Sequence, residues 1–515
     1  MEAINNKKRS VAIIGSGASG LAACKHAQAR GFRPVVFDAG DGVGGVWRHT
    51  LATTRLQTSA QAYRFSDFPW PEEVTAGEEF PRHDQVVAYL AAYARRFCVL
   101  ECLRLGAKVL AVEYVGVAEE EVAAWERWSG NGEAFGDGRG EWLLTVQNRG
   151  SDATQSYKFD FLILCVGRFG TPNTPTFPLN EGPEVFHGKV LHSMEYSRMH
   201  EADATKLIQD KRVVVVGSGK SAFDTVTYCA DTNGCKYPCT MIYRSTQWMV
   251  DPGPVWGVKL GSLCGTRFAE LSRWLVSKLV EAWYKMRIPM KKHGMVPSYS
   301  FWRSIMACRI GILPDGFFNR VDRGKIVLKA CKSFRFCEDG VLLDGGGCEQ
   351  VDADVVILAT GYQADSHLSG LFVSSPWFSK IVAGSSSDDN IAAPLYRQCV
   401  HPRIPQMAVI GHPESPAIIQ TYEMMAKWVA HLLDGEVRLP SVAEMERSVA
   451  EWDDWGRRST TARGGGGCRK SCIGTVMWYK DQLCRDMGHN PRRKKGALLA
   501  EWLQPYGPAD YADIQ

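Results

Sequence analysis

The stretch VVVVGSGKSAFD, residues 213–224, runs four valines into a Gly-Ser-Gly turn. A similar stretch, VAIIGSGASGLAA, already stands at residues 11–23. A buried strand that enters a glycine-rich turn and continues as a helix is typical of a dinucleotide-binding unit, because the start of the helix holds the pyrophosphate. Two such stretches in one chain therefore predict two nucleotide sites.

The first unit has every part of this pattern in order. Residues 9–15 are expected to form a buried strand that is apolar from Val11 to Ile14. A helix is expected from about Ser19 to Arg30, and the next strand, PVVFDAG, ends on Asp38. A carboxylate at that place accepts hydrogen bonds from both hydroxyls of a ribose. The three glycines permit the tight turn, the close approach of backbone to phosphate and the packing of helix on strand. We therefore expect FAD in this unit, held by Asp38 and the turn residues Gly15, Ser16, Gly17, Ala18, Ser19 and Gly20.

The second unit differs from the first in charge. Its helix is expected to begin near Ser221, and its next strand, CTMIYRS at residues 239–245, ends close to Arg244 instead of an acid. A carboxylate there would repel a 2′-phosphate, whereas a guanidinium binds one through two parallel hydrogen bonds. The alternative is that Arg244 is an ordinary surface charge. We expect NADPH in this unit, held by Arg244 and the turn residues Gly217, Ser218, Gly219, Lys220, Ser221 and Ala222.

Two further apolar strands indicate how the units are connected. The stretches beginning FDFLILCVG at residue 159 and DADVVILATG at residue 352 each look like the return strand that closes a nucleotide unit. The expected fold is α/β, with two doubly wound dinucleotide-binding domains and the NADPH domain inserted in a discontinuous FAD domain. The expected parts are residues 1–175, 176–350 and 351–515, with loops at 385–389 and 464–467.

Composition limits the possible partners. The 515 residues are 45% hydrophobic and 23% charged, with a formal net charge of +4, so a nucleic-acid partner is not expected. The beginning of the chain has no apolar stretch of signal-peptide length, and no window has the apolar length of a membrane span, so we expect a cytoplasmic protein. The basic, apolar helix candidate Phe268–Tyr284 lies in the 251–312 region, for which a helical cover, a lid or a peripheral membrane contact are the alternatives.

The 16 cysteines show no paired spacing typical of a redox or zinc site. We therefore expect reduced thiols, many of them packed in the core, and no metal centre. The absence of a Cys-x-x-Cys or Cys-x-x-x-x-Cys pair also argues against a flavin-dependent disulfide reductase.

Several shorter motifs carry a resemblance to a known family. They are GVGGVWRHT at 42–50, FSDFPWP at 65–71, FHGKVLHSMEYSR at 186–198 and LATGY at 358–362. Together with the two glycine turns they resemble the flavin-containing monooxygenases, and the resemblance extends from about Val11 to Tyr506. LQTSAQAYRFSDFPWP and PLYRQCVHPRIP are most similar to the plant branch that N-hydroxylates pipecolic acid in systemic immunity.

This resemblance implies an activity. NADPH would reduce FAD, the reduced flavin and O2 would form a C4a-hydroperoxide, and a soft nitrogen or sulfur nucleophile would take one oxygen atom. The alternatives are S-oxygenation of thioethers and a flavoprotein sensor or NADPH oxidase with uncoupled turnover. A Baeyer–Villiger oxygenase would normally have tryptophan where Tyr196 stands.

The resemblance also implies roles for single residues. Val46 and Trp47 would pack along the cofactor, with a plain core role as the alternative, and Gln57 would be catalytic where many members have asparagine. Asp38 replaces the usual glutamate, and Ser197 separates Tyr196 from the basic residue that normally follows it. His192 and Tyr196 are expected to order the link between the domains.

Two expectations concern the surroundings of the flavin and the substrate. The helix that follows IGHPESPAII would direct its positive end toward the flavin. A substrate carboxylate would need a cationic partner, for which Arg55, Arg64 and Arg397 remain equal candidates.

Overall fold

The computed structural model describes residues 9–75, 77–251, 253–344, 349–363, 368–383, 393–460, 472–496 and 498–515. The two loops expected at 385–389 and 464–467 lie outside these ranges. Within them, no helix combines the length and the apolar character needed to cross a membrane.

The first sheet combines strands from the first part of the chain with β18, which lies about 240 residues further along the sequence than the preceding strand of this sheet, β7. Its five strands have the order β18-β7-β1-β2-β3, and every neighbouring pair is parallel. The helix α1 follows β1, as the glycine turn predicts. The strands and helix are β1 (Ser10–Ile14), β2 (Arg33–Asp38), β3 (Leu103–Leu105), β7 (Phe161–Leu164), β18 (Met407–Val409) and α1 (Ala18–Ala29).

The second sheet lies between β7 and β18 in the sequence. It is also five-stranded and parallel, with the order β13-β10-β9-β17-β8. The predicted fold class is confirmed, because one parallel unit is inserted in the other. The chain leaves the second sheet after Leu358, a few residues beyond the boundary expected at 350. The elements are β8 (Lys189–His192), β9 (Val213–Val216), α7 (Lys220–Asn233), β10 (Cys239–Tyr243), β13 (Ile326–Ala330) and β17 (Val355–Leu358).

Smaller sheets and helices surround these two units. Antiparallel sheets are formed by β4 (Ala107–Val115), β5 (Glu141–Asn148) and β6 (Thr154–Phe159), and by β14 (Ser333–Cys337), β15 (Gly340–Asp344) and β16 (Glu349–Asp352). The parallel pair is β11 (Trp248–Val250) with β12 (Ile310–Ile312). The helices of residues 72–208 are α2 (Glu72–Thr75), α3 (His83–Arg96), α4 (Glu119–Ala123), α5 (Ser193–Ser197) and α6 (Glu201–Ile208). Those of residues 260–503 are α8 (Leu260–Cys264), α9 (Arg267–Leu271), α10 (Arg273–Arg287), α11 (Phe301–Met306), α12 (Phe317–Asp322), α14 (Pro376–Ala383), α15 (Ile418–Leu433), α16 (Val442–Thr460), α17 (Val476–Asp486) and α18 (Leu498–Leu503). The short 3₁₀ helices are η1 (Gly45–His49), η2 (Val99–Cys102), η3 (Trp128–Gly130), η4 (Pro183–Val185) and η5 (Pro508–Tyr511).

The single helix expected over Phe268–Tyr284 is two helices in the structure. α9 ends at Leu271 and α10 begins at Arg273. Ser272 interrupts them because its backbone is non-helical, with φ −93° and ψ 25°, and its hydroxyl donates to the carbonyl of Phe268 at 2.6 Å. A serine that hydrogen-bonds its own backbone competes with helix continuation.

The expectation that the cysteines are all reduced is wrong for one pair. Cys308 and Cys472 form a disulfide, with their Cα atoms 6.0 Å apart and 164 residues between them in sequence. Local spacing could not reveal this pair, since folding alone brings it together. The bridge joins the end of the α8–α11 region to the segment before α17, where the backbone of Ile473 also donates to the carbonyl of Glu414 at 2.8 Å.

A buried charged cluster joins α15 to the FSDFP segment. Both carboxylate oxygens of Glu423 accept hydrogen bonds from Ser66, one from the backbone N–H and one from the hydroxyl, each at 2.7 Å. Lys427 donates to the Ser66 hydroxyl at 3.0 Å and to the carbonyl of Tyr511 at 2.8 Å. Next along the segment, Asp67 pairs with Lys25 of α1 at 2.5 Å. Two helices and the end of the chain therefore fix the position of this loop.

The protonation states in this cluster follow from burial and from charge. Burial alone would raise the pKa of Glu423, but the neighbouring His26, Lys427 and Ser66 together lower it to about 2. Burial lowers the pKa of Lys427, and it lowers the pKa of His26 to about 4. Glu423 and Lys427 are thus a buried ion pair, with Glu423 Oε1 and Lys427 Nζ 3.8 Å apart.

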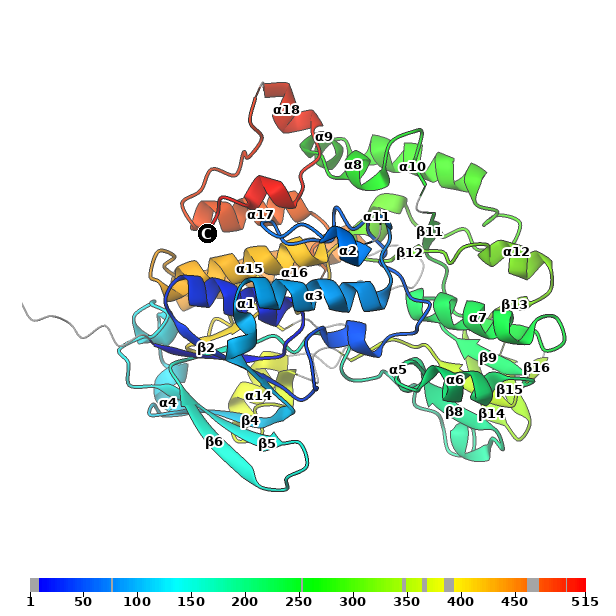
Figure 1. Ribbon diagram of the computed structural model, residues 1–515, viewed down its shortest axis with the longest axis horizontal. Coiled ribbons are helices and arrows are strands. Elements are labelled where there is room, and N and C mark those ends of the chain that lie inside the picture. Colours follow the sequence, from blue (N-terminus) through cyan, green and yellow to red (C-terminus); the bar gives the residue numbers. More distant parts are fainter. Residues whose placement is uncertain are drawn as a thin grey trace, which may run out of the picture.

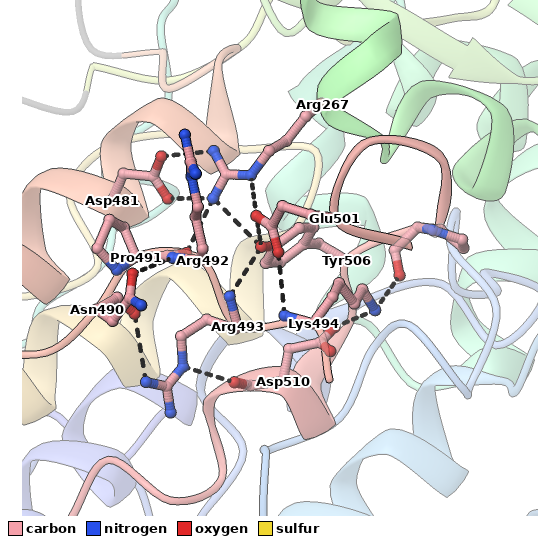
Figure 2. Close-up of polar contacts among 11 residues, drawn as sticks. Arg267, Asp481, Asn490, Pro491, Arg492, Arg493, Lys494, Glu501, Tyr506 and Asp510 are labelled. Carbon is pink, nitrogen blue, oxygen red and sulfur yellow. Dashed lines mark hydrogen bonds and ion pairs between the residues drawn. The ribbon is translucent and has the colours of Figure 1, made fainter. Parts of the chain in front are cut away.

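A second charged cluster joins the α8–α11 region to the end of the chain. Figure 2 shows the guanidinium of Arg267, at the start of α9, facing Asp481 of α17 and Glu501 of α18. Its nitrogens lie 2.6 Å from Asp481 Oδ2 and 2.9 Å from the carbonyl of Pro491. Around it, Lys494 pairs with Asp510 at 2.8 Å. We call the contacts of Arg267 with Asp481 and Glu501 the Arg267 clasp. This clasp and the disulfide hold the inserted unit against the first unit at one side of the molecule.

The buried pair Glu423–Lys427 gives a stability prediction. Glu423→Gln leaves Lys427 buried without its counter-charge and should lower the free energy of unfolding by about 3–5 kcal/mol. The double variant Glu423→Met/Lys427→Met leaves no unpaired charge and should lose clearly less. Denaturant unfolding of the FAD-loaded proteins, followed by circular dichroism and flavin release, measures both.

The same pair has a pH dependence with a defined sign. Because the folded pKa of Glu423 is lowered from 4.5 to about 2, its stabilisation is present above the unfolded value and is lost as the pH falls through this window. Glu423→Gln should remove that part of the acid sensitivity. Equal losses in the single and double variants would contradict the ion-pair interpretation.

Candidate functional site

The first glycine turn is closed by backbone contacts that only glycine allows. Gly15 has φ +108°, and a Cβ atom on it would lie 2.4 Å from the carbonyl oxygen of Cys165, at the end of β7. Its N–H donates to the carbonyl of Phe37 on β2 at 2.8 Å. A Cβ on Gly20 would lie 1.8 Å from the carbonyl oxygen of Gly15, so α1 packs directly on the turn. The turn therefore aims the start of α1 at the carboxyl edge of the sheet.

The start of α1 suits a pyrophosphate. Gly17 occupies the N-cap position, and glycine has no side chain that could bind the first N–H groups of the helix. These groups and the positive end of the helix dipole are thus available to phosphate oxygens. The residues of the turn fit the FAD predicted for this unit.

Asp38 lies where the ribose acid is expected, at the last position of β2. Its Oδ2 accepts hydrogen bonds from the backbone N–H of Ser16 at 2.6 Å and from the Ser16 hydroxyl at 2.7 Å. Its Oδ1 accepts one from the N–H of Gly40 at 2.7 Å. The carboxylate is therefore fixed beside the glycine turn.

The GVGGVW segment forms η1 and packs on the same turn. A Cβ on Gly45 would lie 3.1 Å from the Cα of Gly17, so these backbones nearly touch. Val46 is 48% exposed, which is unlike a core valine. Trp47 is half-buried, and its indole N–H donates to the hydroxyl of Tyr63 at 2.9 Å. Contact of Val46 and Trp47 with a cofactor stays a proposal.

The second glycine turn repeats the construction of the first. Gly217 has φ +144°, and a Cβ on it would lie 2.3 Å from the carbonyl oxygen of Ala359, at the end of β17. Its N–H donates to the carbonyl of Ile242 on β10 at 2.8 Å. Gly219 is the N-cap of α7, and the buried Ala222 follows in the first turn. The second unit thus presents the same kind of helix start, which is available to phosphate oxygens.

Two of the other predicted residues in this turn, Lys220 and Ser218, have structural partners. Lys220 pairs with Asp224 at 2.6 Å, and Asp224 also accepts a hydrogen bond from Thr54 at 3.1 Å. Burial raises the pKa of Asp224. The carbonyl of Ser218 accepts a hydrogen bond from Gln247, whereas Ser221 is exposed. Lys220 therefore belongs to the contact between the two units as well as to the turn.

Arg244 stands immediately after β10, at the carboxyl edge of the second sheet, and is exposed. Asp38, at the end of β2, occupies the equivalent edge of the first sheet. The two units thus place opposite charges at equivalent positions. That Arg244 binds a 2′-phosphate stays a proposal.

Gln57 lies between the units. Its side chain is exposed, and its Oε1 accepts a long hydrogen bond, 3.4 Å, from the N–H of Ile312 on β12. Ser197 forms a second connection, since its hydroxyl donates to the carbonyl of His49 at 2.9 Å. With Thr54–Asp224, these contacts join the 49–57 segment of the first unit to the second. Gln57 therefore lies where the two units meet, and its catalytic role stays a proposal.

His192 and Tyr196 occupy structural positions. Nδ1 of His192 accepts the backbone N–H of Met194 at the start of α5. Tyr196 is fully buried, and its hydroxyl donates to the carbonyl of Ala204 at 3.3 Å. Burial lowers the pKa of His192, which favours the neutral ring.

The segment before α15 lies against the first turn. A Cβ on Gly411 would lie 2.7 Å from the side chain of Ser19, at the start of α1. Near the start of α15, Gln420 donates to the carbonyl of Ala62 at 2.9 Å. This arrangement is compatible with the expectation that α15 directs its positive end toward the flavin, which stays a proposal.

Three features of the site region were missed by sequence reasoning. The Glu423–Lys427 pair could have been found, because both charges stand one helical turn apart in a largely apolar helix. The disulfide and the Arg267 clasp had no comparable signal, since their members are distant in sequence.

The fold and the two turns have the geometry of two dinucleotide-binding units. The family model described as "Flavin-binding monooxygenase-like" matches residues 7–492. Two similar proteins are from Arabidopsis thaliana. One is called probable flavin-containing monooxygenase 1, 35% identical over 97% of this chain and 96% of its own. The other is called putative flavin-containing monooxygenase 2, 34% identical over 93% of this chain and 97% of its own.

Solved structures show the same fold. S-allyl-L-cysteine S-oxygenase from Allium sativum superposes with a TM-score of 0.61 at 20% identity, over 94% of this chain and 89% of that one. A steroid monooxygenase bound to NADP superposes with a TM-score of 0.63 at 17% identity, over 94% and 98%. The chain belongs to the flavin-containing monooxygenase family, whose cofactors are FAD and NADPH.

Proposed function

We propose that this monooxygenase transfers one oxygen atom of O2 to a soft nitrogen or sulfur nucleophile of a small molecule. Within that class we propose N-hydroxylation of pipecolic acid, as part of plant systemic immunity. The observation that carries the proposal is the pair of equivalent turns with opposite charges, Asp38 and Arg244, and Gln57 at their junction. The substrate rests on the resemblance of residues 56–71 and 394–405 to the pipecolate branch.

The proposed roles divide between binding and positioning. Asp38 and the Gly15–Gly20 turn bind the adenosine end of FAD, and Arg244 and the Gly217–Ala222 turn bind NADPH. Bound FAD supplies the oxygen chemistry, which side chains alone lack. The protein excludes water and holds the reacting groups, and the Gln57 amide offers both a hydrogen-bond donor and an acceptor at the junction.

S-oxygenation of a thioether is the second candidate. The S-allyl-L-cysteine S-oxygenase of Allium sativum has the same fold, which makes sulfur a reasonable nucleophile to test. A sensor or an NADPH oxidase with uncoupled turnover is the third candidate, favoured only by glutamine in place of asparagine at position 57.

The test is oxygen transfer by the FAD-loaded protein. With NADPH, O2 and pipecolate, we expect N-hydroxypipecolate in nearly equal amount to the NADPH consumed, measured by mass spectrometry and absorbance. Parallel reactions contain a thioether or no substrate. Product from thioethers alone would contradict the pipecolate assignment, hydrogen peroxide alone would indicate uncoupled turnover, and the lack of flavin reduction would favour the sensor.

We also propose a peripheral contact of α10 with a cytosolic membrane surface. One face of α10 packs inward through Val276, Val280 and Tyr284. The residues of the outward face are 46–71% exposed and apolar: Trp274, Leu275, Leu279 and Met286. The basic residues of this helix are Arg273, Lys278, Lys285 and Arg287. An amphipathic helix with this composition binds anionic lipid surfaces. In Figure 1, α8–α10 and α18 form the upper edge of the molecule.

Vesicle sedimentation tests this contact. The protein should sediment with vesicles that contain an anionic phospholipid, and Trp274→Gln/Leu275→Gln/Leu279→Gln should sediment much less, because the apolar area that inserts is removed. The same substitutions in the presence of neutral vesicles are the control. Equal sedimentation of both proteins would contradict the proposal.

A further inference from the structure

A cavity of about 500 Å³ is lined in part by the segment that follows Gln57 in the sequence. One wall is formed by Ser59, Ala60 and Gln61. The opposite wall is formed by Thr75 and Gly77–Glu79, and the N–H of Ala60 donates to the carbonyl of Glu79 at 2.8 Å. Lys259, just before α8, closes the third side. The cavity is therefore shared by the first unit and the inserted region.

Among the charged side chains that the structure describes around this cavity, one cation has no carboxylate partner. Glu79 pairs with Lys259 at 2.5 Å, and Glu78 pairs with Arg55 at 2.6 Å. Arg64 also lines the cavity, and among the described residues none accepts a hydrogen bond from it. Its Nε is shut off from solvent and has no partner. A partly buried guanidinium with unmet donors favours an anionic partner, because its desolvation is otherwise uncompensated.

The other two candidate arginines are already neutralised. Arg55 donates to Glu78 and to the carbonyl of Phe80 at 3.1 Å. Arg397 binds Asp486 through two nitrogens at 2.7 and 3.1 Å and donates to Gln482 at 2.6 Å. Neither guanidinium is therefore available to a ligand. Of the three arginines that the sequence offered as partners for a substrate carboxylate, Arg64 is the one that remains.

Arg64 is also held in a rigid surrounding. The preceding Tyr63 accepts the indole N–H of Trp47, the residue proposed to lie along the flavin. Trp70, another wall of the cavity, donates to the carbonyl of Tyr63 at 2.7 Å and stacks on Tyr89 with ring centres 4.2 Å apart. The cavity thus combines one unpaired guanidinium with a fixed aromatic ring, a few residues from Gln57.

We propose that Arg64 binds the carboxylate of the substrate in this cavity, with the apolar part of the substrate against Trp70. The substrate class is then a small organic acid that carries the nitrogen or sulfur nucleophile, such as an amino or imino acid. This inference rests on the proposed function and narrows it, because neutral amines and thioethers lack the group that Arg64 recognises. A planar guanidinium and a carboxylate form two parallel charge-assisted hydrogen bonds.

The experiment compares acids with their methyl esters, which differ by one charge. Isothermal calorimetry measures the binding of pipecolate, (methylthio)acetate and their methyl esters to the FAD-loaded protein. We expect the wild type to bind at least one acid about tenfold or more tightly than its ester. In Arg64→Gln this preference should fall below about threefold, and Arg64→Lys should lie between, since lysine keeps the charge without the fork.

The matched control is Arg104→Gln. Arg104 is an exposed arginine on β3, away from the cavity lining, so this variant should keep the wild-type preference. FAD content and thermal unfolding establish that each variant is folded. If Arg64→Gln does not fold, the acid-over-ester preference of Arg64→Lys is used for the comparison instead. Acids that bind no tighter than esters, or a preference that survives in Arg64→Gln, would overturn the inference.

Oxygen transfer is measured separately, so the two proposals fail in different ways. If acids are preferred through Arg64 but no product forms, the inference stands and the proposed function fails. If product forms equally from acids and esters and Arg64→Gln changes neither, the proposed function stands and the inference fails.

Discussion

The structure depends on a close backbone contact, in which the first glycine of each turn lies against the carbonyl group at the end of a neighbouring parallel strand. It occurs twice, at Gly15 against Cys165 and at Gly217 against Ala359. Because no Cβ fits there, each strand must turn sharply and start its helix at the carboxyl edge of its sheet. The same edge ends β2 in Asp38 and places Arg244 after β10. One backbone constraint, used twice, thus produces two similar helix starts that are available to phosphate groups and have different charged neighbours.

The parts of the fold that could be predicted from sequence are those whose cause is local. In each unit the apolar strand, the glycine turn and the residue that ends the next strand all lie within about 30 residues, and the structure has them in the expected order. The break at Ser272 was missed because one hydroxyl decides it. Cys308–Cys472 and Arg267–Asp481 were missed because their partners are far apart in the chain.

The candidate site shows the same division. The residues of both turns follow from spacing, and Gln57 was placed by resemblance. The choice among Arg55, Arg64 and Arg397 needed the folded chain, since only there are the carboxylates visible that neutralise two of them. The buried pair Glu423–Lys427 has a related role, because it fixes Ser66 and so the loop that carries Arg64. The residue proposed to bind the substrate carboxylate and a contact that stabilises the fold thus lie on one segment, residues 57–70.

The central claim is that charge at equivalent strand ends separates the two nucleotides. The most direct measurement is the ratio of kcat/KM for NADPH to that for NADH, in the wild type and in Arg244→Ser, with FAD content as the control. The account predicts that the substitution lowers the ratio about tenfold or more through the loss of the 2′-phosphate contact, with FAD retained. An unchanged ratio, or a loss of FAD instead, would contradict it.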